Sequence, residues 1–452
     1  MKIPFALREV AGVFARNGSE VYLVGGAVRD SLRGKTPHDF DLAVSADAEV
    51  VRDMFRAVRG AQVIPTGLKH GTVTLRYKGF SFEATTFRTE SAYSDGRHPD
   101  TVTKAATIEE DLARRDFTMN ALALELPAGK RLVDPFGGRD DIKRGLIRAV
   151  GDAATRFAED GLRPLRAFRF AAQTGFIVDT AILDAVPSAL GATAKVSVER
   201  IRDEFDKTVM APSPLRALIY MEETGLLRLF LPELAACRGV EQKGRHLFDV
   251  FGHSLHALEY AAIHGYPHPV RLAALFHDIG KPETAAKDSI GIWTFYQHER
   301  HSAQMTEALM RRLRYPNTLT AQVVRLVKEH MFHYEDTWKD AAVRRFYIRV
   351  GPSALNDLFM LRLCDTYATA LAYPDPASLL PLRRRIEIML EKSTALGLKD
   401  LAVNGSDLIA AGLRPGKRLG IILNELLQAV IDDPALNTRE TLLAIARNLD
   451  AR

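Results

Sequence analysis

The chain has 452 residues, about three times the length of a typical domain, so we expect several compact units rather than one core. Hydrophobic residues make up 47% and charged residues 26%, which excludes an extensively disordered chain. The formal net charge of +5 is compatible with a polyanionic partner but does not by itself demonstrate one.

The cysteines and the N-terminus indicate the compartment. Cys237 and Cys364 stand far apart without a CxxC or CxxH arrangement, so neither a disulfide framework nor a zinc knuckle is predicted. The first twenty residues lack the apolar core and cleavage site of a signal peptide, and no apolar run of about 18 residues occurs. We therefore expect a cytoplasmic protein with no membrane partner.

Short β-like runs alternate with helical patterns over the first part of the chain, and strands almost disappear after it. This predicts a multidomain α+β fold, with a mixed sheet and helices in a head at 1–145. Pattern changes and proline-containing breaks then predict three all-α parts. These are a neck at 146–239, a histidine-rich domain at 240–372 and a tail at 373–452.

The stretch VYLVGGAVRDSLRGKTPHDFDLAV, residues 21–44, contains a glycine pair and two aspartates one residue apart. VYLVGG is typical of a strand that ends in a glycine turn before a helix. The amides of Gly25, Gly26 and the helix start can therefore hold a phosphate chain. Asp39 and Asp41 lie two residues apart on a second predicted strand, so their side chains project from the same face.

Two carboxylates on one face repel each other unless a cation lies between them. Mg²⁺ binds one or two carboxylates together with substrate phosphates, and two such ions can activate a hydroxyl and stabilise a leaving pyrophosphate. An isolated DxD is more often a solvated edge strand, but the glycine pair upstream favours chemistry here. We expect nucleotidyl transfer, with Asp39 and Asp41 as catalytic ligands of Mg²⁺ in the head.

The same residues carry a family resemblance. Gly25, Gly26, Arg29, Asp30 and Asp39-Phe40-Asp41 resemble the head signature of class II tRNA nucleotidyltransferases, the CCA-adding enzymes, and of the related bacterial poly(A) polymerases. Five further blocks of that family follow in order: PTGLKHGTVTL (65–75), TTFRTESAYSDGRHPDTV (85–102), IEEDLARRDFTMNALAL (108–124), DPFGGRDDIKRGLIRAVGD (134–152) and EDGLRPLRAFRFAAQTGF (159–176). The resemblance implies a polymerase-beta-like nucleotidyltransferase head, a helical neck, and body and tail domains that hold the tRNA acceptor arm.

The block RRDFTMN contains candidates for nucleotide binding. Arg115, Asp116 and Asn120 suit a triphosphate, a ribose hydroxyl and the local backbone respectively, and the resemblance assigns the block to ribose and nucleotide contacts. A helix N-cap is the alternative role of Asp116.

Two neighbouring features complete the predicted head. Glu83 lies on a probable strand as a candidate third catalytic acid, although a lone strand glutamate is usually solvent-facing. The polar, turn-rich segment from Arg88 to Asp100 resembles the flexible loop that accompanies the final A addition in the family.

The segment EDGLRPLR predicts how a base is chosen. Asp160 and Arg163 are spaced i, i+3 and would share one helix face, where a carboxylate and a guanidinium can pair with cytosine and adenine but not guanine or uracil. An ordinary surface ion pair is the alternative. Pro164 requires the helix to start close to Asp160. Arg166 and Arg169 on the same helix are further nucleotide-binding candidates.

The histidine-rich region resembles an HD domain. Its implied metal ligands are His253, His277, Asp278 and Asp365, which His298 and His330 can extend. Mixed imidazole and carboxylate ligands suit a transition metal such as Ni²⁺, Mn²⁺, Co²⁺ or Fe²⁺ that activates water for phosphoester hydrolysis. Any single histidine is more often a packed or surface residue.

The last segment resembles the family's tail. In its RPGKRLG turn, Arg414, Lys417 and Arg418 can bind RNA phosphates, and a helix connector with solvated charges is the alternative.

Three functions compete. The favoured one is a CTP/ATP:tRNA nucleotidyltransferase that builds or repairs the 3′ CCA end, with tRNA, CTP and ATP as partners and a monomer or homodimer as the assembly. A sibling would add only A, only CC, or poly(A). The third is an HD phosphohydrolase on a degenerate head, against which the intact DxD and RRDFTMN blocks argue.

Overall fold

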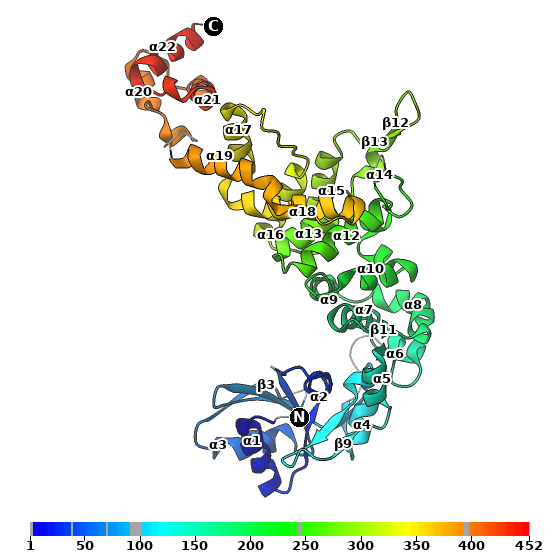
Figure 1. Cartoon of the computed structure of the whole chain (residues 1–452). Helices are drawn as coiled ribbons and strands as arrows, with labels where there is room; N and C mark the ends of the chain where they lie inside the picture. The colour runs from blue at the N-terminus through cyan, green and yellow to red at the C-terminus, as the bar shows by residue number, and fades with distance from the viewer. Residues whose placement is uncertain are drawn as a thin grey trace. The chain divides into compact units, whose positions relative to one another are not determined.

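The computed structural model describes residues 3–37, 39–68, 71–90, 102–242, 246–391 and 397–451. The chain divides into two compact units, Met1–Ala235 and Ala236–Arg452. Figure 1 shows the sheet of the first unit in blue and cyan, and helices throughout most of the rest. The multidomain α+β fold with a mixed sheet in the head is confirmed. The bounds of the four predicted domains stay predictions.

The head is built on a seven-stranded sheet with the order β3-β4-β5-β2-β1-β8-β9. Neighbours in this order are antiparallel except β2 and β5, which run parallel. The strands are, in sheet order, β3 (Ala61–Gly67), β4 (Thr72–Tyr77), β5 (Phe80–Thr86), β2 (Phe40–Val44), β1 (Val21–Val24), β8 (Ala123–Glu125) and β9 (Leu132–Val133).

Residue alternation gives the sheet one covered face and one open face near β2. Phe40, Leu42 and Phe82 are buried, whereas Asp41 and Glu83, which alternate with them, are exposed. Helix α3 (Ala48–Arg56) packs on β3, β4 and β5, and α1 (Phe5–Arg16) packs on α3 and β1 (Figure 1). The polar residues of β2 and β5 therefore lie on the face away from these helices.

Shorter elements complete the head. Helix α2 (Gly26–Leu32) follows β1 directly, while α4 (Ile108–Ala113) and α5 (Gly138–Arg144) flank a single 3₁₀ turn, η2 (Thr118–Asn120). The two-stranded ribbon β6 (Arg88–Glu90) and β7 (Val102–Lys104) brackets residues 91–101. Most of the predicted loop Arg88 to Asp100 thus lies outside the described residues.

The remainder of the first unit is helical. Its helices are α6 (Ala153–Glu159), α7 (Arg163–Thr174), α8 (Thr180–Thr193), α9 (Val198–Val209), α10 (Pro214–Glu223) and α11 (Pro232–Ala235). A short parallel pair is formed by β10 (Leu146–Ile147), which precedes α6, and β11 (Ile177–Val178), which lies between α7 and α8.

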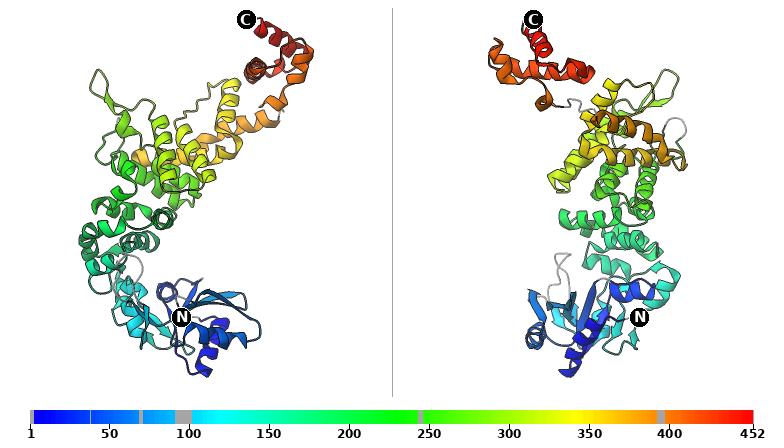
Figure 2. Two further views of the ribbon diagram at one scale, coloured as in Figure 1. Left: turned by 180° about the vertical axis from the view of Figure 1, so that it is seen from behind. Right: turned by 60° about the vertical axis from the view of Figure 1, so that its left-hand side comes forward.

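The second unit is almost entirely helical, apart from the hairpin β12 (Ala286–Lys287) and β13 (Trp293–Thr294), which Figure 2 shows in green. Its first helices are α12 (Val250–Ile263), α13 (His268–Phe276), α14 (Lys281–Thr284), α15 (His298–Arg312), α16 (Asn317–Glu329), α17 (Asp340–Val350) and α18 (Leu355–Ala370). The last are α19 (Leu380–Glu391), α20 (Gly405–Ala410), α21 (Lys417–Asp432) and α22 (Arg439–Asp450).

The last three helices share an apolar core that includes Leu408, Leu426 and Leu442. Arg344 of α17 donates to the carbonyls of Ile431 and Asp432, so a cation satisfies the C-terminal end of α21. Among the described helices, none combines the length and apolar character that crossing a bilayer requires.

Candidate functional site

The acidic residues of the head meet on the open face of the sheet. Asp41 of β2 lies directly opposite Glu83 of β5 in the register of the parallel pair, and Asp39 immediately precedes β2. Partial loss of hydration raises the pKa of Asp41, and the negative charges of Glu83 and Asp39 add to this, against the opposing charge of Arg115. Three carboxylates that repel one another and remain open to solvent suit a divalent cation.

The glycine turn lies beside these acids, because β1 is the neighbour of β2. Gly25 has φ +67°, and a Cβ at this position would lie 3.0 Å from the Nη1 atom of Arg115. The turn therefore needs glycine for its backbone conformation, and the absence of a side chain also leaves room for Arg115. The Gly25 N–H donates to the carbonyl of Leu122, so the free amides for a phosphate begin at Gly26.

Arg29 faces inward from α2 instead of projecting into solvent. Its Nη1 donates to Oδ1 of Asn120 over 2.8 Å, and its Nε donates to Oδ1 of Asp30 over 2.9 Å. Asn120 in turn donates to Oδ1 of Asp116 over 3.2 Å. Oδ2 of Asp116 accepts hydrogen bonds of 2.8 and 2.6 Å from Nε and Nη2 of Arg166 on α7. A continuous polar chain thus joins α2 to the neck helix.

Asp116 does not cap the helical turn that follows it, since Phe117 holds that position. Burial opposes its ionisation, but the charge and hydrogen bonds of Arg166, with the amide of Asn120, lower the pKa of Asp116 to about 2. Asp116 is 8% exposed and ionised at neutral pH, and its two oxygens are held by residues from the head and the neck.

Arg115 is held by an acid that the sequence analysis did not single out. Its Nη2 lies 3.3 Å from Oδ2 of Asp111, which is 1% exposed and also pairs with Arg114. Arg169 pairs with the buried carboxylate of Glu204 on α9, with Nε and Oε2 2.6 Å apart. The i, i+4 spacing of Asp111 and Arg115 was the available signal for this pair.

The expectation that Asp160 and Arg163 share one helix face is wrong. Asp160 terminates α6 with extended backbone angles, and α7 begins only at Arg163, with Pro164 in its first turn. Gly161 lies between them and packs so closely on α8 that a Cβ there would be 2.5 Å from the backbone of Ala192. The chain turns at this glycine, so the two side chains leave from different elements.

The two side chains also have different partners. Arg163 is 6% exposed and donates to the carbonyls of Arg156 and Arg114 over 2.8 and 3.2 Å, and it pairs with Glu159. Asp160 accepts the N–H of Leu162 over 3.0 Å and lies 3.7 Å from Nη2 of Arg200. In this arrangement Arg163 braces the neck.

A second polar cluster lies in the second unit and contains all six histidine and aspartate candidates. Two groups of ligand atoms come together there: His253, His277 and Asp365, and Asp278, His298 and His330. Oδ2 of Asp278 is 3.2 Å from Nε2 of His277, while Oδ1 is 3.2 Å from Nε2 of His298. One buried carboxylate therefore faces both groups, as a ligand shared by two ions would.

The imidazoles are oriented for metal binding. His277, His298 and His330 each place Nδ1 within 2.6 to 2.9 Å of a backbone carbonyl, which fixes the proton there and leaves Nε2 free for a ligand bond. Burial lowers the pKa of His330 to about 3, so this ring is neutral at physiological pH. The donor set of nitrogen and carboxylate oxygen atoms fits a transition-metal pair.

Two cations beside this cluster were missed from the sequence. Nζ of Lys281 lies 2.6 Å from Oδ2 of Asp278, and Nη1 of Arg362 lies 3.1 Å from Oδ2 of Asp365. Both line a cavity of about 450 Å³, together with aromatic side chains that include Trp293 of β13 and Tyr296, which follows this strand. Lys281 follows the His-Asp pair by three residues in HDIGK, a spacing that was visible in the sequence.

The tail candidates lie at the start of α21. Arg414 and Lys417 are exposed, and Gly416 precedes the helix without a side-chain cap. Arg418 instead donates to the carbonyl of Leu449 over 2.8 Å and pairs with Asp450, at the end of α22. Of the three candidates, Arg418 therefore holds the start of α21 against the end of α22.

A polymerase-type sheet with acids on adjacent strands and a glycine turn beside them defines the class of the head as a nucleotidyltransferase. Family models agree along the chain: "Poly A polymerase head domain" matches residues 21–148, "Probable RNA and SrmB- binding site of polymerase A" matches 175–238, and tRNA nucleotidyltransferase domain 2 matches 285–446.

Known proteins resemble the whole chain. A CCA-adding enzyme of Lactobacillus helveticus is 33% identical over 96% of this chain and 94% of its own, and one of Geobacillus sp. is 44% identical over 52% and 56%. The crystal structure of the Bacillus stearothermophilus CCA-adding enzyme in complex with CTP has a TM-score of 0.74 and 30% identity, covering 99% of this chain and 98% of that one. The chain belongs to the CCA-adding enzyme family, and the resemblance of its sequence blocks to that family is confirmed.

Proposed function

We propose that this protein is a template-independent CTP/ATP:tRNA nucleotidyltransferase that adds or repairs the 3′-terminal CCA of tRNA. The observation that carries the proposal is the register of the parallel strands, which sets Asp41 against Glu83 beside an intact glycine turn, in a chain related to CCA-adding enzymes over its whole length. Bound Mg²⁺ would lower the pKa of the attacking hydroxyl and neutralise the phosphates.

In this proposal, each residue has a role that follows from where it lies in the head. Asp39, Asp41 and Glu83 hold the metal, and Gly26 with Arg29 and Arg115 receives the triphosphate. The 3′-hydroxyl oxygen of the tRNA forms a bond to the α-phosphorus, the bond from that phosphorus to the bridging oxygen of the β-phosphate breaks, and pyrophosphate leaves. The hydroxyl proton passes to solvent.

In this proposal, Asp160 and Arg163 select the base, and Asp116 binds the ribose. Because Arg163 is turned into the neck, presentation of both groups to a base requires its side chain to leave Glu159. The exposed Arg414 and Lys417 suit RNA phosphates.

The deciding experiment supplies tRNA that ends before the CCA with CTP alone, ATP alone, or both. We expect CC from CTP alone and the complete CCA only from the mixture. Addition of A alone, of CC alone in the mixture, or of a long A tract would assign the chain to a sibling activity.

A second candidate function rests on the six-ligand cluster of the second unit. We propose that His253, His277, Asp278, His298, His330 and Asp365 hold two transition-metal ions and hydrolyse phosphoesters, with Lys281 and Arg362 as phosphate-binding cations. Metal analysis of the purified protein, followed by an assay with 2′,3′-cyclic nucleotides, tests this. A metal-free and inert protein would reduce the domain to a scaffold.

A further inference from the structure

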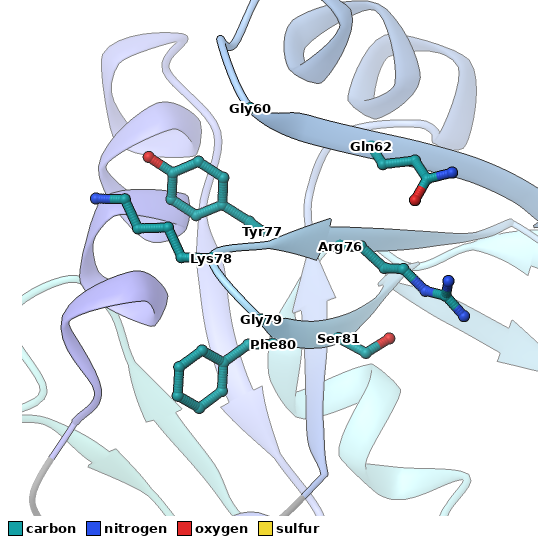
Figure 3. Close-up of a pocket in the computed structure, with 8 residues that line it drawn as sticks. All are labelled: Gly60, Gln62, Arg76, Tyr77, Lys78, Gly79, Phe80 and Ser81. Atoms are coloured by element: carbon teal, nitrogen blue, oxygen red, sulfur yellow. The ribbon is translucent and has the colours of Figure 1, made fainter.

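Polar residues continue across the open face of the sheet beyond the acids. Ser81 of β5 lies opposite Arg76 of β4, and Arg76 lies opposite Gln62 of β3. All three side chains are exposed, and they line a shallow cavity of about 310 Å³ on this part of the sheet. Figure 3 shows Gln62, Arg76 and Ser81 extending to the same side, with Tyr77, Lys78 and Phe80 on the other.

This row shares its face with the catalytic acids. Ser81 and Glu83 are two residues apart on β5, so their side chains leave the same side of the strand, and Glu83 faces Asp41 in the register. Two strand spacings separate β4 from β2, which places the backbone of Arg76 about 10 Å from that of the acidic strand. An arginine side chain can cover much of this distance.

Arg76 is a cation without a partner among the described residues. No hydrogen bond or ion pair engages its guanidinium there, whereas the neighbouring Lys78 pairs with Glu9 on α1 over 2.6 Å. An exposed, unpaired guanidinium close to three carboxylates that it does not neutralise is available for an anion supplied by a substrate.

The chemistry indicates which substrate lies over this row. In an in-line displacement, the attacking and leaving oxygens lie on opposite sides of the phosphorus. Gly26 and Arg29 place the leaving pyrophosphate on the β1 side of the acids, so the attacking hydroxyl comes from the β5 side. The strand that carries this hydroxyl then extends over β5, β4 and β3.

We propose that Arg76, flanked by Ser81 and Gln62, binds a backbone phosphate next to the 3′ end of the acceptor RNA. Arg76 is a positioning residue that holds the attacking strand against the acids. The inference rests on the nucleotidyltransferase function proposed above and adds to it a subsite for the RNA strand.

The test compares Arg76→Ala and Arg76→Lys with the wild type, using tRNA that ends before the CCA. We expect Arg76→Ala to weaken tRNA binding about tenfold, to leave the KM for CTP unchanged, and to reduce the slope of log affinity against log salt by about 0.7, the contribution of one phosphate contact on a single strand. Arg76→Lys should restore the salt slope and part of the affinity, because it keeps the charge. Arg8→Ala is the matched control, since Arg8 is an exposed arginine on α1, over the covered face.

Unchanged tRNA affinity and salt slope in a folded Arg76→Ala protein would overturn the proposal. So would a rise in the KM for CTP with tRNA binding intact, which would assign Arg76 to the triphosphate. If the wild type itself adds no nucleotide to tRNA, the proposed function fails, whereas the binding and salt measurements still report on Arg76.

Discussion

Arg166 of the neck helix and Asp116 of the head form a two-point contact, with Nε and Nη2 of the arginine 2.8 and 2.6 Å from the same carboxylate oxygen. Asp116 is 8% exposed, and the side chain of Arg166 is 33% exposed. The contact therefore satisfies a buried charge and fixes the first turns of α7 against the segment of the head between α4 and η2.

Loss of this contact should destabilise the first unit. We expect Arg166→Ala to lower the free energy of unfolding by about 1–3 kcal/mol, because a buried carboxylate loses its cation. Urea unfolding without nucleotide measures the change, and Arg166→Lys, which keeps the charge, should lose less.

The same pair predicts a pH dependence. The pKa of Asp116 is about 2 in the folded protein, below its ordinary value of 3.8, so its stabilisation is complete above about pH 4 and is lost as the pH falls toward 2. Unfolding curves between pH 5 and pH 2.5 should show this loss in the wild type. They should be flatter in Arg166→Ala, and identical slopes would contradict the assignment.

Asp41 should favour activity at a cost in stability. Because the pKa of Asp41 is raised, its ionised form is unfavourable in the folded protein, and its contribution to stability falls as the pH rises through that pKa. Asp41→Asn should therefore raise the thermal unfolding midpoint at neutral pH while it lowers CCA addition by about a thousandfold or more. Mg²⁺ should stabilise the wild type but not the variant, and Glu83→Gln tests whether the third acid behaves alike.

Asp160 and Arg163 should separate in their mutational effects. We expect Asp160→Ala to relax the preference for C and A over G and U with little change in Mg²⁺ affinity, because Asp160 lies between α6 and α7 and not on the strands that carry the metal-binding acids. Arg163→Ala should in addition lower stability, since three neighbouring residues lose a donor. Misincorporation assays and urea unfolding read the two effects independently, and an unchanged nucleotide preference in Asp160→Ala would count against its role in base choice.

The metal centre should be separable from CCA addition. Asp278→Asn removes a charge from the carboxylate that faces both ligand groups, so we expect the metal content to fall from two ions to one or none and cyclic-phosphate hydrolysis to be lost. CCA addition should persist, because the acids of the head lie in the other compact unit. Loss of both activities together would instead indicate a folding defect, which thermal unfolding would reveal.

One tryptophan reports on the cavity beside the metal centre. The chain has two tryptophans, and only Trp293 lines this cavity, whereas Trp338 packs on the rings of Tyr334 and Phe346. In a Trp338→Phe protein, a 2′,3′-cyclic nucleotide should change the remaining fluorescence in a saturable manner. The Trp293→Phe protein serves as the control and should show no such change.

Local patterns made much of this structure predictable. The glycine turn and the alternating acids are properties of short segments, and the structure has Gly25 directly after β1 and Asp41 on β2. Lys281 was visible in the same way but carried no separate signal, because a lysine after a turn is ordinarily solvated.

The errors have a common physical origin in packing between distant segments. Asp160 and Arg163 have helical spacing, yet the close approach of α8 to Gly161 forces a turn between them. The place of Arg76 on the acidic face likewise depends on the order of the strands in the sheet, which a single strand cannot reveal.

The parallel pairing of β2 with β5 has a consequence for synthesis of the chain. Two antiparallel strands, β3 and β4, are formed between them in sequence, so Asp41 cannot meet Glu83 until all four strands have left the ribosome and the sheet has closed. The brace from Arg166 arrives later still. A nascent head therefore emerges without its assembled acid cluster, and nucleotidyl transfer to cellular RNA begins only after the sheet has closed and the neck has formed.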